Sequence, residues 1–149
     1  MSRRTHCCPT LGLPYGRAVP DPDTRAVLAA NAAFYDAFER ADVETMADLW
    51  ERSDRAACTH PGWQRLSGWR TVLRSWAAIL GNGQALQFIL TNERVDVIGD
   101  AAVVLVDENI VGEGIGGTVA AVNLFARQTD RTWRMIGHHG APVTRTVEI

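Results

Sequence analysis

The chain has 149 residues, of which 46% are apolar and 21% charged, and this composition predicts one soluble domain built around a single core. A formal net charge of -2 offers no basic surface to a polyanion, so nucleic acid is not an expected partner. All fifteen basic residues are arginine, which excludes Schiff-base chemistry and a phosphate-binding lysine.

Residues 1–20 predict a flexible arm ahead of a single domain at 21–149, because they offer no apolar face to bury. Cys7 and Cys8 are adjacent, and with Cys58 the cysteines are odd in number, which favours neither a disulfide framework nor a zinc site. The expected compartment is therefore the reducing cytoplasm. No segment resembles a signal peptide or reaches about 18 apolar residues, so no membrane association is expected.

Three helices are expected in the first half of the chain. The run Asp21-Pro22-Asp23-Thr24 is typical of a helix start, and apolar residues at three- and four-residue spacing continue that helix to about Arg40. Asp42 is expected to cap a second, short helix. Ser67 is expected to cap a third, which Gly81-Asn82-Gly83 ends.

From residue 86 the apolar period becomes strand-like and predicts four strands, after a short one near 56–59. Their expected ranges are 86–98, 101–111, 118–128 and 132–142. The apolar phase of the first changes along its length, which indicates a bulge near Thr91 to Arg94. Helices followed by strands predict an α+β fold, with three N-terminal helices on one face of a curved antiparallel sheet.

Several short segments of this sequence resemble the bacterial SnoaL-like branch of the nuclear transport factor 2-like superfamily. The resemblance covers about residues 24–143 and rests on His60-Pro61-Gly62-Trp63, Gly68, Ser75-Trp76, Asn123-Leu124-Phe125, Trp133 and His138-His139. It implies a cone fold, in which helices and a strongly curved sheet enclose a pocket. The superfamily includes isomerases, dehydratases and polyketide cyclases as well as noncatalytic dimerisation modules, so the fold alone does not assign an activity.

The hairpin turns decide which polar side chains share the pocket face. If the Asp130-Arg131 turn places Asn123 opposite His139, and the glycine-rich loop at 112–117 places Glu108 opposite Asn123, the three form one cluster. A carboxylate beside a histidine in an apolar cavity suits proton transfer. We therefore expect His139 as the base, Glu108 as its orienting partner and Asn123 as a donor to an oxyanion.

Two alternatives stay open at this point. A one-residue slip in each hairpin would bring together Asp107, Asn123 and His138 instead. We favour the first register because Trp133 and Met135 carry the apolar phase of the last strand to its second histidine. In either register the polar groups could instead do no more than satisfy one another's hydrogen bonds.

Aromatic residues and the other histidines are expected to line the pocket for a small apolar molecule. The expected ligand-binding residues are Tyr35, His60, Trp63, Trp76 and His138, with Trp63 the strongest candidate. No close His/Glu ligand spacing occurs, and adjacent strand residues point to opposite faces, so neither a metal nor another cofactor is expected.

The sequence thus predicts a small-molecule pocket protein, with cofactor-free acid/base chemistry of isomerase, dehydratase or cyclase type on an apolar or polyketide-like substrate. The alternative is a noncatalytic ligand-binding or dimerisation module of the same fold. The strands at 102–106 and 119–122 are apolar on both faces, but the helices can cover only one. We therefore expect a homodimer formed through the outer face of the sheet.

Overall fold

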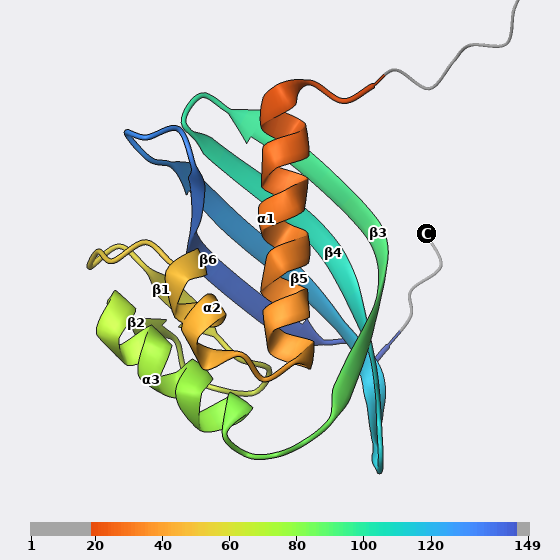
Figure 1. The fold of residues 1–149 in the computed structure, drawn as a ribbon. Coiled ribbons are helices and arrows are strands. Elements are labelled where there is room, and N and C mark those ends of the chain that lie inside the picture. Colours follow the sequence, from red (N-terminus) through yellow and green to blue (C-terminus); the bar gives the residue numbers. More distant parts are fainter. Residues whose placement is uncertain (1–18, 146–149) are drawn as a thin grey trace, which may run out of the picture.

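The computed structural model describes residues 19–145, which form three helices and one six-stranded sheet (Figure 1). The elements are α1 (Pro22–Glu39), α2 (Val43–Leu49), β1 (Ala57–Thr59), β2 (Leu66–Ser67), α3 (Trp69–Leu80), β3 (Leu86–Ile98), β4 (Ala101–Gly112), β5 (Ile115–Arg127) and β6 (Trp133–Pro142). Most of the expected arm, including Cys7 and Cys8, lies outside the described residues.

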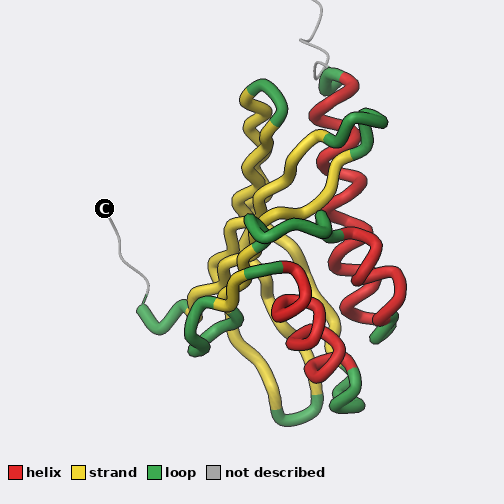
Figure 2. Tube along the Cα trace, turned by 90° about the vertical axis from the view of Figure 1, so that its left-hand side faces the viewer, coloured by secondary structure: helices red, strands yellow, loops and turns green. Residues whose placement is uncertain are grey.

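The α+β fold is confirmed, with all three helices on one side of a curved, open sheet (Figure 2). We call the side of the sheet that the helices cover its inner face and the opposite side its outer face. The strand order is β2-β1-β6-β5-β4-β3, and the four long strands form the expected antiparallel meander. The short strand β1 adds to β6 in parallel, so the sheet is mixed. In residues 19–145 no helix is long and apolar enough to cross a membrane.

The N-caps of α1 and α2 are the residues predicted from the sequence, but the N-cap of α3 is not. The carboxylate of Asp21 accepts from the backbone N–H groups of Asp23 and Thr24 at 3.0 and 3.1 Å, and Asp42 caps α2 in the same manner. The expectation that Ser67 caps α3 was wrong. Ser67 lies in β2, paired with β1, and Gly68 takes the cap position at a φ of 84°. A two-residue strand leaves too weak a periodic signal to be seen in sequence.

The β3 bulge is confirmed between Thr91 and Arg94, but the next hairpin is tighter than expected. Instead of a loop over 112–117, the strands continue to a two-residue turn whose Gly114 has a φ of 70°. This register pairs Glu108 with Val119, so the expectation that Glu108 lies opposite Asn123 was wrong.

A second bulge, in β6, changes the face on which its two histidines lie. Leu124 pairs with Gly137 while the next residue of β5 pairs with Met135, which leaves Ile136 as the extra residue. A Cβ at Gly137 would lie 3.0 Å from Leu124 Cδ1, so any larger residue here would require Leu124 to shift. Beyond the bulge Asn123 pairs with His138. The preferred pairing of Asn123 with His139 was therefore wrong, because the apolar phase of Trp133 and Met135 does not continue past the bulge.

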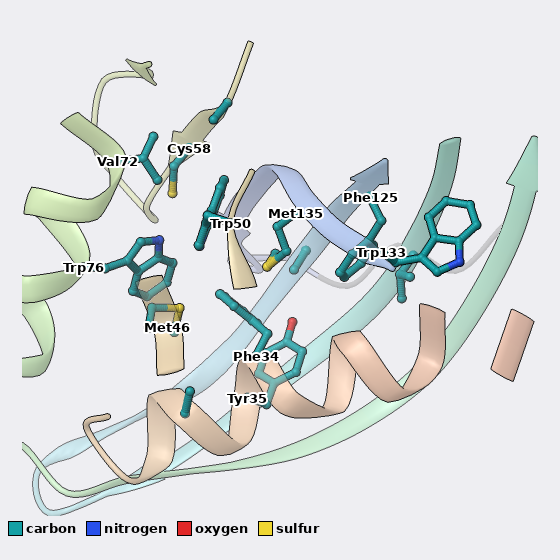
Figure 3. Close-up of a cluster of buried hydrophobic side chains, with 14 of the residues drawn as sticks. Phe34, Tyr35, Met46, Trp50, Cys58, Val72, Trp76, Phe125, Trp133 and Met135 are labelled. Carbon is teal, nitrogen blue, oxygen red and sulfur yellow. The ribbon is translucent and has the colours of Figure 1, made fainter. Parts of the chain in front are cut away.

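The core lies between the inner face and the helices (Figure 3). Its largest fully buried side chains are Trp50, Trp76, Phe34, Phe125, Met46 and Met135. Each contributes roughly 1.5–3 kcal/mol by leaving water, so together they hold the helices over the sheet. Buried polar side chains interrupt this apolar layer, and they form the site described next.

Candidate functional site

A cavity of about 190 Å³ opens between the helices and the inner face. Six parts of the fold contribute to it: the end of α1, the loop after β1, and α3, β3, β4 and β6. Its lining residues are Phe38, His60, Pro61, Trp63, Trp76, Ile79, Phe88, Glu108, Ile110 and His138. Most of the lining is apolar, and the three titratable residues in it are a carboxylic acid and two histidines.

Glu108 is the acidic group of the cavity. It lies on the inner face of β4, is 5% exposed, and accepts a hydrogen bond from the Tyr35 hydroxyl at 2.7 Å. Burial raises the pKa of Glu108 from its ordinary value of 4.5 to about 7, although the Tyr35 hydrogen bond acts in the opposite direction. The carboxyl group is therefore poised between its two protonation states near neutral pH, so it can both accept and return a proton.

Asn123 fixes the tautomer of His138. Its amide nitrogen donates to the Asn31 side-chain oxygen at 2.8 Å and to the Tyr35 hydroxyl at 3.1 Å. Its amide oxygen lies 2.6 Å from His138 Nδ1. Because that oxygen can only accept, His138 must carry its proton on Nδ1, and the Nε2 atom of the neutral ring keeps a free lone pair.

His138 is neutral at all ordinary pH values in this setting. Its side chain is almost completely buried, and this burial, with smaller contributions from His60 and His139, lowers its pKa to about 3. Its Nε2 has no hydrogen-bond partner among residues 19–145, and the residue lines the cavity. His138 is therefore a hydrogen-bond acceptor for a bound molecule rather than a cation.

His60 forms the other side of the cavity and is held by α3. Its Nε2 lies 2.8 Å from Ser75 Oγ, whose hydroxyl donates to the Val72 carbonyl at 2.7 Å, so the His60 nitrogen must be the donor. Burial lowers the pKa of His60 to about 4, which keeps this ring neutral too. Trp63, 50% exposed, packs edge-on against it with ring centroids 4.9 Å apart and lies at the mouth.

The polar network continues from the cavity toward β3, the edge strand of the sheet. Asn31 Nδ2 donates to the exposed Glu93 carboxylate at 2.9 Å, while its own oxygen accepts from Asn123. Through Asn123 and Tyr35 this chain of hydrogen bonds reaches Glu108. The network holds the two cavity groups at defined positions, because every buried amide in it is paired.

The cavity is lined by five of the residues predicted for the site: His60, Trp63, Trp76, Glu108 and His138. Tyr35 and Asn123 lie behind the lining, where they bind Glu108 and His138.

His139 lies on the outer face, where its Nδ1 is 2.8 Å from Thr59 Oγ1, and Asp107 lies there too, accepting from Asn92. The observed cluster thus mixes the two predicted registers, with Glu108 from one and His138 from the other.

Two residues of the site were not identified from the sequence. Asn31 is fully buried on α1 at a position with apolar neighbours at helical spacing, and a polar residue in such a stripe is a signal that could have been used. Ser75 enters the sequence analysis only as part of the family resemblance, whereas in the structure it holds His60. In the described part of the chain, no group of three or more His, Cys, Asp or Glu side chains is arranged to hold a metal ion.

Comparison with known families agrees with this architecture, because a model of the SnoaL-like domain matches residues 27–144. The chain belongs to this family. Among curated proteins, none matches the chain. This SnoaL-like domain is similar to a solved structure of a proposed dehydratase from the nuclear transport factor 2-like family of Streptomyces avermitilis. The two are 39% identical with a TM-score of 0.78, over 85% of this chain and 100% of that one.

Two further solved structures are similar to the domain. A proposed calcium/calmodulin-dependent protein kinase type II association domain from Thiobacillus denitrificans is 30% identical, with a TM-score of 0.68, over 87% of this chain and 100% of that one. A proposed ketosteroid isomerase from Parabacteroides distasonis shares the fold, with a TM-score of 0.67 at 13% identity, over 79% of this chain and 86% of that one. The domain is thus a pocket protein of the SnoaL-like family.

Proposed function

We propose that this SnoaL-like domain is a cofactor-free acid/base enzyme of dehydratase or isomerase type that acts on a small, mostly apolar molecule. The observation that carries the proposal is the Glu108 carboxyl group, whose pKa is raised to about 7 at the wall of an apolar cavity. The similarity to a proposed dehydratase supports the same class of reaction. The cavity volume of about 190 Å³ lies below the ~300 Å³ of common ligand pockets, so the substrate is small.

Glu108 is the strongest base that the cavity offers, because both histidines have lowered pKa values. In a dehydration, its carboxylate removes a proton from the carbon next to a carbonyl group and becomes a carboxylic acid. The acid then protonates the leaving hydroxyl group, so that a C–H and a C–O bond break, a C=C bond forms and water leaves. Returning the same proton to another carbon instead would complete an isomerisation.

The neutral histidines would orient the substrate. His138 Nε2 offers a lone pair in the same cavity as the Glu108 carboxyl group, and a substrate hydroxyl can donate to it. His60 has its Nε2 proton engaged with Ser75, so its Nδ1 is also an acceptor, with the Cys58 thiol 3.9 Å away. Asn123 and Tyr35 are positioning residues in this scheme, since both act through the groups they bind. Glu108 thus takes the role of base that was expected of His139. His138 replaces His139 as the histidine of the site.

The proposal is tested with Glu108→Gln, matched by Asp107→Asn, its neighbour on the outer face. With a panel of small β-hydroxy ketones, elimination of water is followed by the absorbance of the enone formed. Glu108→Gln should lower the rate by roughly 10² or more, the usual contribution of a positioned acid or base. Asp107→Asn should leave it within about twofold. Equal rates for Glu108→Gln and the wild type would overturn the assignment of Glu108.

A noncatalytic dimerisation module is the second candidate, favoured by the similarity to an association domain. The outer face offers a surface for a second copy of this chain, with Ile89 59%, Leu105 38% and Val111 50% exposed. Half-buried Val122 and Leu124 of β5 continue the same apolar surface. We propose a homodimer through this face, which is compatible with either function because the cavity opens on the other side of the sheet.

A further inference from the structure

A second and larger cavity lies between α2 and α3, outside the acid/base site. This groove has a volume of about 520 Å³, within the ~300–1,000 Å³ of small-molecule sites. Its walls are mainly apolar, from Val43 and Met46 on α2 and Leu73 and Ala77 on α3. Figure 1 shows these helices side by side, and Figure 3 shows the Trp76 indole beside Met46. Trp76 lines both the groove and the inner cavity.

The groove carries positive charge that no carboxylate of the described chain neutralises. Arg70 and Arg74, one turn apart on α3, both line it and are both exposed. Neither forms an ion pair within residues 19–145, whereas five other arginines do: Arg40, Arg52, Arg55, Arg94 and Arg127. Asp48 of α2 already pairs with Arg52 at 3.5 Å. The groove therefore has an unpaired cationic rim.

One of these guanidinium groups is also held in place. Arg70 Cζ lies 4.8 Å from the centre of the Trp69 ring, which itself lines the groove. A guanidinium stacked on an indole keeps its N–H edges free, and those edges match the two oxygens of a carboxylate. Apolar walls with an ordered arginine at the rim favour a molecule that has one apolar part and one anionic group.

We propose that the α2/α3 groove binds a small apolar molecule bearing a carboxylate, of the medium-chain fatty-acid class. The chain would lie against Met46 and Leu73, and the carboxylate would bind Arg70 and Arg74. From Trp69 to Ala77 α3 rises only ~12 Å, a length that suits one short chain rather than a long peptide. This site goes beyond the proposed function and does not depend on it, because none of its arginines touches the Glu108 cavity.

Calorimetric titration with octanoate tests the proposal on the full chain. The wild type should bind octanoate in the groove, and Arg70→Gln or Arg74→Gln should each weaken binding by up to about fivefold, with a loss on the order of tenfold for the pair. Arg145→Gln removes the same charge outside the groove and should change nothing. Ala77→Phe fills the groove without changing its charge and should abolish binding. The melting temperature of this variant verifies that it folds.

Three results would overturn the proposal. Equal binding of uncharged octanol, with no effect of the arginine variants, would mean an unspecific apolar surface. Binding to vesicles of anionic lipid without binding of octanoate would mean a membrane contact. No binding of octanoate to the wild type would mean that the groove has a different occupant. Glu108→Gln should leave octanoate binding unchanged, so this test and that of the acid/base site fail independently.

Discussion

His138 and His139 are adjacent in the chain and chemically identical, yet the two faces of the sheet give them different surroundings. His138 is 3% exposed on the inner face, bonded to Asn123, with its pKa lowered to about 3 by burial. His139 lies half-buried on the outer face against Thr59. One extra residue in β6, Ile136, decides which histidine enters the cavity. The comparison teaches that a bulge can select a functional residue without changing the composition of a strand.

The same contrast holds for the two acidic residues of β4. Glu108 faces the cavity and receives the Tyr35 hydroxyl, whereas Asp107 faces outward and receives the side-chain amide of Asn92. Each inner residue thus has an outer neighbour of like chemistry. Paired substitutions at neighbouring positions can therefore separate the effect of the site from the general effect of removing a charge or a ring.

The largest expected effect on stability separates the two histidines. His138→Ala removes a buried ring and leaves the Asn123 oxygen unpaired, so the free energy of unfolding should fall by about 3–5 kcal/mol. His139→Ala should cost less than about 1 kcal/mol, because its side chain is half-buried. Urea denaturation at pH 7 measures both. Similar losses for the two variants would mean that the two faces are not energetically distinct.

A second prediction concerns pH and Glu108. The folded protein holds the Glu108 proton up to about pH 7, whereas the unfolded chain releases it near 4.5, so this group destabilises the fold as pH rises through that window. Glu108→Gln should therefore raise the free energy of unfolding by on the order of 3 kcal/mol at pH 8 and by almost nothing at pH 4.5. Asp107→Asn, unfolded at the same two pH values, serves as the control. A gain that does not depend on pH would contradict the raised pKa.

The two inner histidines should act in the opposite direction. Their pKa values are lowered to about 3 and 4, so the unfolded chain takes up protons below pH 6.5 that the folded chain does not. Stability should fall as the pH drops from 6.5 toward 4. His138→Asn keeps a donor for Asn123 but cannot titrate in this range, so melting temperatures of this variant should decline less between pH 6.5 and 4.5. An equal decline would assign acid sensitivity to other groups.

The smallest expected effect lies on the outer face. Leu105→Asp places a charge in the proposed dimer surface and should weaken association by on the order of tenfold or more. Ala78→Asp, an exposed position on α3, adds the same charge away from that face. Sedimentation of the two variants and the wild type over a range of concentrations measures the difference. If the wild type is a monomer at micromolar concentration, the proposed dimer is wrong.

Most of the fold could be predicted from the sequence because its periodicity is strong. The bounds of β3 and the caps at Asp21 and Asp42 follow directly from apolar phase and short polar side chains. What escaped prediction depends on contacts between distant segments. The two-residue strand β2 exists only through its pairing with β1, and the turn at Gly114 is tighter than the surrounding glycines indicate.

The sequence predicted the residue types of the site, but not the strand pairing that decides which of these residues face the cavity. That a carboxylate, an asparagine and a histidine share the inner face could be inferred, since buried polar groups must pair. Which histidine does so depends on the bulge at Ile136. Unlike the bulge of β3, it is followed by Gly137, two histidines and Gly140 rather than by large apolar residues, so no change of apolar phase reveals it. The bridging role of Tyr35 was likewise beyond sequence reasoning, because it joins α1 to β4.

The most direct test of the central claim is the titration of the Glu108 carboxyl carbon by NMR, with Glu108→Gln used to assign the signal. We expect a midpoint near pH 7, because the carboxyl group is buried beside neutral rings in an apolar cavity. Such a midpoint would place a poised proton donor and acceptor in the pocket. A midpoint near the ordinary value of 4.5 would contradict the account, since the carboxylate would then be a permanently ionised structural group.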